Sequence, residues 1–268
     1  MKLAISGKGG AGKSTLAAAL CLLLSREGSR VLAVDADPDG NLAAALGGSP
    51  EELSRIVPVS KQRALLEERT GIKVREYGQM FKLNPEVSDI AANYATRVNG
   101  VTLLVLGAIE AGGSGCACPE SVLLRALVRE LVLHGEDALV MDMEAGIEHL
   151  GRATAQGVDA LLVMVEPSRR AIDSAHRVER LAAEIGLRDI RFVLNKISSS
   201  AEEEYLRAAL PERNLAGVIP WSEQIRLAEQ QGLPVLPSPD EKLASSLAGI
   251  LRHLRSSIAR KRKELNAL

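Results

Sequence analysis

The sequence predicts an α/β fold, with a doubly wound, mostly parallel sheet and helices on both of its faces. Short, almost continuously apolar runs recur along the chain, helical patterns separate them, and a glycine-rich loop joins the first run to the first helical pattern. Continuous apolar runs are typical of parallel strands that are buried on both faces. Because the 268 residues contain no repeat and no linker, we expect a single domain over 1–268.

The expected strands are short apolar runs, and the expected helices are amphipathic stretches between them. The strands lie at about 3–5, 31–34, 101–106, 138–141, 160–165 and 190–194, with a seventh just before Ile219. The helices lie at about 14–27, 119–133, 147–156, 168–186, 200–210, 222–231 and 239–263. Residues 50–98 are the least regular part, where we expect an insertion of short helices with a small hairpin around 74–83.

The first strand leads into a loop that fits the phosphate-binding pattern G-x-x-x-x-G-K-[ST]. Its glycines allow successive backbone N–H groups to converge on a phosphate chain, and the following helix adds its positive N-terminus. Lys13 is expected to reach the β- and γ-phosphates, and the Ser14 hydroxyl to bind Mg²⁺. The pattern therefore predicts a P-loop NTPase with a nucleoside triphosphate site. The expected site residues are Gly9, Gly10, Ala11, Gly12, Lys13, Ser14 and Thr15.

Acidic residues follow two of the expected strands, at the sheet edge where ligands bind in doubly wound folds. The second strand ends in Asp35, Asp37 and Asp39, and carboxylates this close repel one another unless a cation or a water network separates them. Asp142 ends the run at 138–141 and is expected to hold Mg²⁺ through water. Asp39 also fits a simpler role as the cap of the next helix.

Composition argues against several classes of function. The formal net charge is −1, so nothing indicates a general nucleic-acid partner, and aromatic residues make up 2%, too few for a base-stacking surface. The sequence holds no apolar run of about 18 residues and starts directly with a strand, so we expect neither a transmembrane span nor a signal peptide. We therefore expect a cytoplasmic protein. Its three cysteines then favour metal or thiol chemistry over disulfides.

Two of the cysteines, Cys116 and Cys118, lie in a glycine-rich loop that ends at Pro119. Two sulfur atoms rarely complete a metal site, because soft tetrahedral sites take four ligands. A two-fold dimer supplies four if Cys116 and Cys118 of each subunit meet on its axis. Zinc, nickel or an iron–sulfur cluster fits such a site, and the ligands do not choose among them. A redox pair of thiols and a pair of ordinary loop residues are the rival interpretations. Cys21 lies on an apolar helix face, where we expect a small buried residue.

The glycine-rich loop carries a second lysine, Lys8, in the pattern K-G-G-x-G-K-[ST]. This pattern resembles the deviant P-loop of the dimeric ATPases that include nitrogenase iron protein and the Min and Par partitioning ATPases. The resemblance implies that Lys8 crosses the dimer interface to the partner's nucleotide, as an arginine finger does. It also implies that Asp37 orients the attacking water, that Asp35 supports the Mg²⁺ shell, and that Gly146 in a second switch offers its N–H to the γ-phosphate. The residues expected near the adenine of ATP are Asn195, Lys196 and Pro220.

Three further patterns narrow the resemblance. D-A-D-P-D after the second strand, C-x-C-P, and D-x-E-A-G-x-E-H-x-G-R after the run at 138–141 together resemble the CooC-type maturation ATPases of carbon monoxide dehydrogenase and their sister group for acetyl-CoA synthase. The resemblance covers the chain from residue 1 to about 235. It implies a homodimer that cycles between ATP and ADP and delivers Ni²⁺ to a nickel–iron–sulfur client enzyme. Ni²⁺ or Zn²⁺ would bind at the cysteine pair, and nickel follows from the resemblance alone.

Two other functions stay open. A Min- or Par-type positioning switch is one, since the tail at 243–265 has an apolar stripe and a basic end that fit a helix lying on anionic lipid. We expect the stripe to pack on the sheet instead, which makes a membrane partner the less favoured interpretation. An iron–sulfur cluster carrier is the other function, although the second switch here lacks the cysteine that nitrogenase iron protein uses.

Overall fold

The structure is a computed structural model and describes residues 1–72, 80–107, 119–134, 138–147, 150–236 and 240–265. Its strands are β1 (Lys2–Gly7), β2 (Val31–Ala36), β3 (Thr96–Val98), β4 (Val101–Val105), β5 (Ala138–Met143), β6 (Ala160–Val165), β7 (Ile190–Ile197) and β8 (Leu215–Pro220). They form one eight-stranded sheet in the order β3-β4-β2-β5-β1-β6-β7-β8. Neighbouring strands are parallel except β3 and β4, which are antiparallel. The predicted fold class is confirmed.

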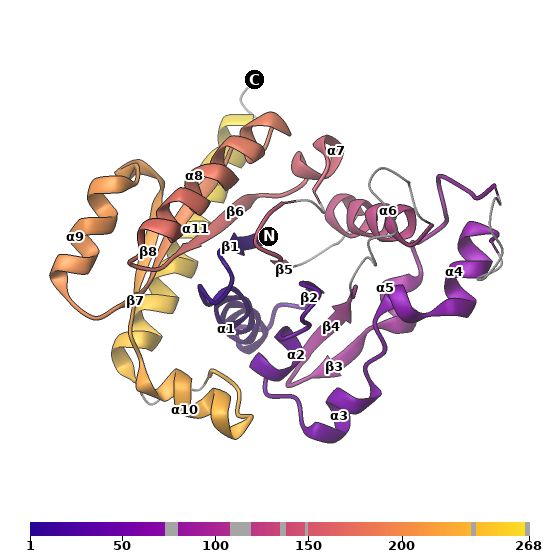
Figure 1. Cartoon of the computed structure of the whole chain (residues 1–268), viewed down its shortest axis with the longest axis horizontal. Helices are drawn as coiled ribbons and strands as arrows, with labels where there is room; N and C mark the ends of the chain where they lie inside the picture. The colour runs from indigo at the N-terminus through magenta and orange to yellow at the C-terminus, as the bar shows by residue number, and fades with distance from the viewer. Residues whose placement is uncertain (73–79, 108–118, 135–137, 148–149, 237–239, 266–268) are drawn as a thin grey trace.

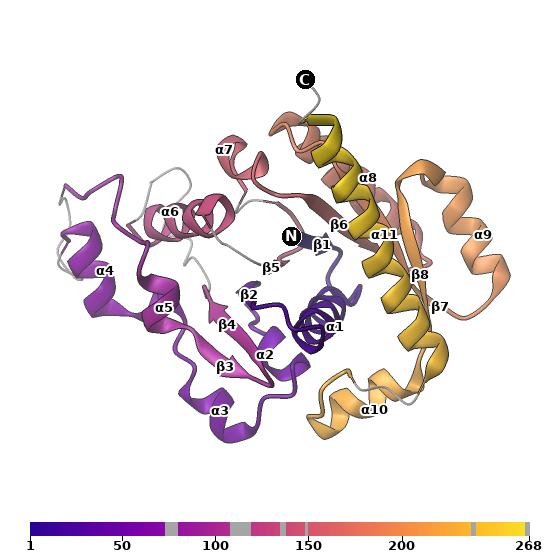
Figure 2. The ribbon, with the colours of Figure 1, turned by 180° about the vertical axis from the view of Figure 1, so that it is seen from behind.

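Helices cover both faces of this sheet, as Figures 1 and 2 show from opposite sides. The longer ones are α1 (Lys13–Arg26), α6 (Pro119–His134), α8 (Arg169–Glu184), α9 (Ser200–Ala209), α10 (Glu223–Gln231) and α11 (Glu241–Leu265). The shorter ones are α2 (Leu42–Ala45), α3 (Pro50–Arg55), α4 (Arg63–Thr70), α5 (Ile90–Tyr94) and α7 (Arg152–Ala155), with 3-10 turns η1 (Val59–Lys61) and η2 (Glu212–Asn214).

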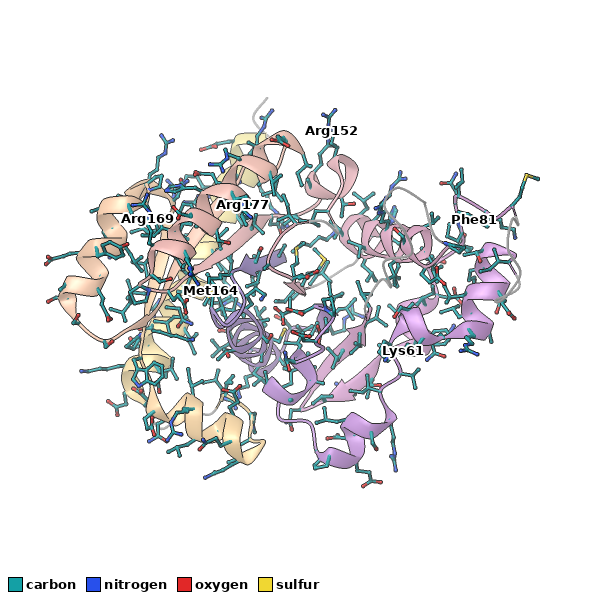
Figure 3. All side chains as sticks on the ribbon, viewed as in Figure 1. Lys61, Phe81, Arg152, Met164, Arg169 and Arg177 are labelled. Carbon is teal, nitrogen blue, oxygen red and sulfur yellow. The ribbon has the colours of Figure 1, made fainter. Side chains whose placement is uncertain are left out.

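Two apolar cores hold these helices to the sheet, one on each face. Leu16 of α1 and Leu254 of α11 are buried in one core together with Ile5 of β1. Leu127 of α6 and Ala175 of α8 are buried in the other. The polar side of α8 faces outward, where Figure 3 labels Arg169 and Arg177. Because both faces of the sheet are covered, the strands are apolar on both sides, which is the pattern that predicted them.

The apolar stripe of α11 packs inside the protein. Its side chains are at most 6% exposed and lie in the core that also contains α1. This confirms the expected packing of the stripe on the sheet. No helix in the described part of the chain is both long and apolar enough to cross a membrane. The stripe consists of Leu243, Leu247, Ile250, Leu251, Leu254 and Ile258.

The strand register gathers the chemically important residues at one edge of the sheet. Asp142 of β5 is the register partner of Ile5 on one side and of Asp35 on the other. Gly7, the last residue of β1, pairs with Met164 of β6. The phosphate-binding loop and both acidic strand ends therefore lie at the carboxyl edge, where doubly wound sheets bind ligands.

One predicted helix is wrong. Instead of a helix over 147–156, only α7 is helical, and 148–149 lie outside the described residues. Gly151 precedes α7 with an extended backbone (φ −94°, ψ 172°), which stops the helix from extending backwards. Before it, the Leu150 N–H donates to the carbonyl of Ile147 at 2.9 Å in a turn. The described residues between β5 and α7 are therefore not helical.

Strand β3 was not predicted, because it is only three residues long. It pairs with β4 through a two-residue turn at Asn99 and Gly100, which have φ values of 45° and 84°. The short helices expected within 50–98 are present as α3, α4 and α5. Of the hairpin expected at 74–83, most lies outside the described residues, and 80–83 are not in a strand.

Candidate functional site

The loop between β1 and α1 has a shape that only glycine allows at two positions. Gly12 has a φ of 93°, and a Cβ atom there would collide with the side-chain amide of Asn195. A Cβ atom at Gly7 would lie 2.7 Å from the carbonyl oxygen of Met164. Figure 3 labels Met164. The loop therefore lies directly against the ends of β6 and β7.

Two side chains from β7 hold this loop in place. The Asn195 amide nitrogen donates to the carbonyl of Ala11 at 2.7 Å, and the Lys196 ammonium donates to the carbonyl of Gly10 at 2.7 Å. Lys196 has a φ of 62°, an uncommon and strained conformation for a residue with a side chain. The expected adenine-contacting residues Asn195 and Lys196 thus fix the conformation of the phosphate-binding loop.

Lys13 begins α1 and is the buried cation of the site. Only 7% of its side chain is exposed, and its ammonium lies 3.5 Å from Asp37 Oδ2. The other oxygen of Asp37 accepts the N–H of Asp39 at 3.1 Å. The N–H of Leu42, at the start of α2, donates to Asp35 and not to Asp39. The capping role suggested for Asp39 is therefore wrong. Asp37 lies beside Lys13, at the place where a bound phosphate could replace it as the partner of that lysine.

Asp35 and Asp142 lie side by side on β2 and β5 and are fully buried. Burial raises the pKa of Asp35 to about 6, although its carboxylate accepts the N–H groups of Leu42 at 3.0 Å and Asp37 at 3.2 Å. Burial raises the pKa of Asp142 to about 7, and the nearby Ser14 hydroxyl offsets this only in part. The Ser14 hydroxyl is close to Asp142 but does not meet the distance and angle of a hydrogen bond. Neither oxygen of Asp142 therefore has a hydrogen-bond partner among the described residues.

Two unpartnered carboxylate oxygens inside a protein call for a proton or a cation. Asp142 lies next to Ser14 and near Lys13, at the start of α1, with Asp35 on the adjacent strand. Hard divalent cations such as Mg²⁺ prefer carboxylate, hydroxyl and water oxygens. The residues at this position therefore fit Mg²⁺ bound together with a phosphate chain.

The segment after β5 is tied to the first strand. The Ser6 hydroxyl donates to the carbonyl of Gly146 at 2.8 Å, with the carbonyl of Glu144 at 3.3 Å. The Gly146 N–H donates to the Glu144 carbonyl at 2.7 Å. For Gly146 to donate to a γ-phosphate, this internal bond must break first. A γ-phosphate that took this N–H would therefore change the conformation of the segment, which is what a switch role requires.

A further carboxylate, Glu166, follows β6 directly and contacts two lysines. Its Oε1 atom accepts a hydrogen bond from the Lys8 ammonium at 2.8 Å, and its Oε2 atom lies 3.8 Å from the Lys196 ammonium. The side chains of Lys8 and Glu166 are 36% and 20% exposed, so water partly screens the pair. Both lysines of this network belong to or contact the phosphate-binding loop.

An apolar hollow adjoins the loop on the side of β8. Thr15 and Asn195 are the polar members of its lining, beside apolar side chains that include Met164 and Ile219. Pro220 follows Ile219 directly at the end of β8. The hollow is about 10 Å³ in volume, which is space for about one water molecule, so a base at the position expected near Asn195 and Pro220 would have to open it.

Comparison with known proteins assigns the chain to a family. Residues 2–235 match the model described as the CobQ/CobB/MinD/ParA nucleotide binding domain. The chain belongs to this family. The carbon monoxide dehydrogenase accessory protein CooC of Rhodospirillum rubrum is 40% identical over 257 residues, which cover 95% of this chain and 97% of that protein. An uncharacterized ATP-binding protein of Methanocaldococcus jannaschii is 39% identical over the same shares of the two chains.

The resemblance to the CooC-type proteins is therefore confirmed, within the CobQ/CobB/MinD/ParA family. Among solved structures, the MinD cell division protein of Aquifex aeolicus superposes with a TM-score of 0.64. That likeness covers 95% of this chain and 96% of that chain at 23% identity, which supports the P-loop NTPase fold alone.

The structure brings most of the expected site residues of this nucleotide-binding domain to one sheet edge. Cys116 and Cys118 are the exception, because they lie outside the described residues. Ser6 and Glu166 were not predicted. An acidic residue directly after an apolar run was the signal that identified Asp142, and Glu166 carries the same signal after 160–165.

Proposed function

We propose that this protein is a Mg²⁺-dependent ATPase that works as a homodimer and delivers nickel to the cluster of carbon monoxide dehydrogenase or acetyl-CoA synthase. The observation that carries the ATPase activity is the buried ammonium of Lys13 at 3.5 Å from Asp37, beside the unpartnered carboxylate of Asp142. The 40% identity to CooC, an accessory protein of carbon monoxide dehydrogenase, supports the client class.

The described residues take the following roles. Lys13 and the loop N–H groups bind the phosphates, which replace Asp37 as the partner of Lys13 and free Asp37 to orient the attacking water. Ser14 and Asp142 would hold Mg²⁺, and Asp35 supports them from the adjacent strand. When bound, this ion neutralises charge on the phosphates. Adenine would lie beside Asn195, where the apolar hollow of about 10 Å³ must widen to admit it.

The dimer supplies the remaining parts. Lys8 would act from the partner subunit on the developing phosphate charge, so hydrolysis by a lone subunit is slow. Nickel is cargo, held between Cys116 and Cys118 of the two subunits in one nucleotide state. Because the same closure completes both sites, ATP changes the metal affinity by a coupling free energy on the order of 1–3 kcal/mol.

The test combines sizing with metal analysis. Light scattering with ADP and with ATP plus Mg²⁺ should give a dimer with ATP, and elemental analysis should find one metal ion per dimer. A monomer under all conditions would refute the shared site and favour a redox pair of thiols. Iron with sulfide in place of nickel or zinc would identify an iron–sulfur cluster carrier.

Three variants separate the two sites. Lys13→Ala should abolish ATP-dependent dimerisation. Cys116→Ser combined with Cys118→Ser should remove the metal and leave ATP binding unchanged. Cys21 is a buried cysteine of α1, and the control variant Cys21→Ala should still bind both the metal and ATP. A double cysteine variant that still binds one metal ion per dimer would show the assignment to be wrong.

A Min-type positioning switch is the second candidate, because MinD shares the fold. Such switches act at membranes, and the burial of the α11 stripe argues against lipid binding through that helix. Liposome co-sedimentation with and without ATP separates the candidates. A maturation ATPase stays in the supernatant in both conditions, whereas ATP-dependent pelleting would favour the positioning switch.

A further inference from the structure

We propose that Glu166 is a positioning residue that holds Lys8 on its own subunit and so sets how tightly two subunits close on ATP. The inference rests on the proposed function, in which Lys8 crosses to the partner's nucleotide. Its basis is the contact between the Lys8 ammonium and Glu166 Oε1 at 2.8 Å. Among the described residues, Glu166 is the one carboxylate that pairs with Lys8. Lys8 must leave this carboxylate before it reaches a phosphate of the partner.

Glu166 lies in a hydrogen-bonded turn between β6 and α8. Val165, the residue before it, ends a strand that is hydrogen-bonded on both sides by β1 and β7. After it, the Ser168 N–H donates to the Glu166 carbonyl at 2.7 Å, and the Ser168 hydroxyl accepts the Ala171 N–H at 3.2 Å as the cap of α8. The carboxylate is therefore presented to the loop from a fixed position.

Lys196 lowers the free-energy cost of releasing Lys8 from Glu166. Its ammonium lies 3.8 Å from Glu166 Oε2 and donates to the Gly10 carbonyl at 2.7 Å. When Lys8 moves away, Lys196 remains to neutralise Glu166. The carboxylate is then never left without a cation, which would carry the larger penalty. The arrangement therefore fits an exchange of Lys8 between two anions, Glu166 on its own subunit and a phosphate on the other.

The Glu166→Gln variant tests this exchange. Glutamine keeps the shape of the side chain and removes its charge. With a non-hydrolysable ATP analogue and Mg²⁺, the dimer dissociation constant should fall about 2- to 25-fold. Partly exposed pairs contribute about 1.5- to 5-fold each, and a two-fold dimer releases two of them. The gain should shrink in high salt, because salt screens the pair in the reference protein. Glu166→Asp, which is shorter, should give an intermediate gain.

Glu203→Gln is the matched control. Glu203 pairs with Arg207 on α9 at the same 2.8 Å, with side chains 34% and 37% exposed. Helix α9 lies at the outer edge of the molecule in Figure 1. This variant should leave the dissociation constant unchanged. In a Lys8→Gln background, Glu166→Gln should also have no effect, because the lysine that it releases is absent.

Three outcomes would overturn the inference. They are an unchanged or weaker dimer for Glu166→Gln, an equal gain in the Lys8→Gln background, and an equal gain for Glu203→Gln. Unfolding temperatures equal to that of the unsubstituted protein exclude a folding defect. If the unsubstituted protein never dimerises with ATP, the proposed function fails and the inference fails with it. Dimerisation that does not respond to Glu166 defeats the inference alone.

Discussion

Replacing Asp142 with asparagine should stabilise the protein in the absence of nucleotide and Mg²⁺. The carboxyl group is fully buried and has no hydrogen-bond partner among the described residues. Burial raises its pKa from the ordinary 3.8 to about 7. Because the folded state holds this proton more tightly than the unfolded state, the stability falls as the pH rises from about 4 to about 7. Asparagine mimics the protonated acid and removes this loss.

The magnitude follows from the pKa. A change from 3.8 to about 7 corresponds to about 4 kcal/mol at pH 8, where the folded protein carries the buried charge. At pH 5 the folded carboxyl group is still protonated, and the loss is about 1.5 kcal/mol. Urea unfolding at both pH values should therefore show that the advantage of Asp142→Asn grows by about 2–3 kcal/mol from pH 5 to pH 8.

Asp35→Asn is the contrasting variant. The Asp35 carboxylate accepts two backbone N–H groups, from Asp37 and Leu42, and an amide has one acceptor oxygen to offer. Losing one of these bonds costs about 1 kcal/mol and offsets part of the gain from removing the charge. Asp142→Asn should thus stabilise more than Asp35→Asn at pH 8. An Asp142→Asn variant with no advantage at pH 8 would show that the carboxylate already has a counter-ion, and would refute the argument.

Three further substitutions test the framework of the site. Gly12→Ala should abolish ATP binding in a fluorescent-nucleotide titration and cost about 1–3 kcal/mol, because its φ is 93° and a Cβ atom would meet Asn195. Ser6→Ala removes the hydrogen bond to the Gly146 carbonyl, so we expect a loss of about 1 kcal/mol in urea unfolding and slower hydrolysis at unchanged ATP affinity. Leu254→Ala, on the buried face of α11, should cost about 2–5 kcal/mol by the same assay without changing ATP affinity.

The phosphate-binding edge was predictable from the sequence, because the geometry of a parallel sheet determines where the residues after its strands lie. Any residue directly after a buried parallel strand lies at the same edge. Asp35 and Asp142 follow such runs, so their proximity could be expected without coordinates, and the register makes them direct neighbours. The short hairpin at 96–101 was not predictable in the same way, because three residues of strand give no clear periodicity.

The contacts that hold the loop were not predictable, because they depend on strand order. Asn195 and Lys196 follow Ala11 by more than 180 residues, yet their side chains bind the loop carbonyls. The amide of Asn195 is expected to contact a purine, and nothing in the sequence indicated that its nitrogen also donates to the loop. Local patterns show where a strand ends and which residue follows it. They do not show which other strand end its side chain will face.

Strand order also explains why two carboxylates beside the same loop take different roles. β1 lies between β5 and β6, so Asp142 and Glu166 flank the loop from opposite sides. Asp142 is fully buried and has no hydrogen-bond partner among the described residues, so in that place it needs either a proton or a cation held by oxygen ligands. Glu166 is 20% exposed and contacts two lysines. At that depth the loss of Lys8 from Glu166, with Lys196 remaining beside it, costs little free energy. Contact of Lys8 with a phosphate can offset that cost. Depth at the sheet edge therefore separates a carboxylate that needs a proton or a cation from one that two partly exposed lysines already neutralise.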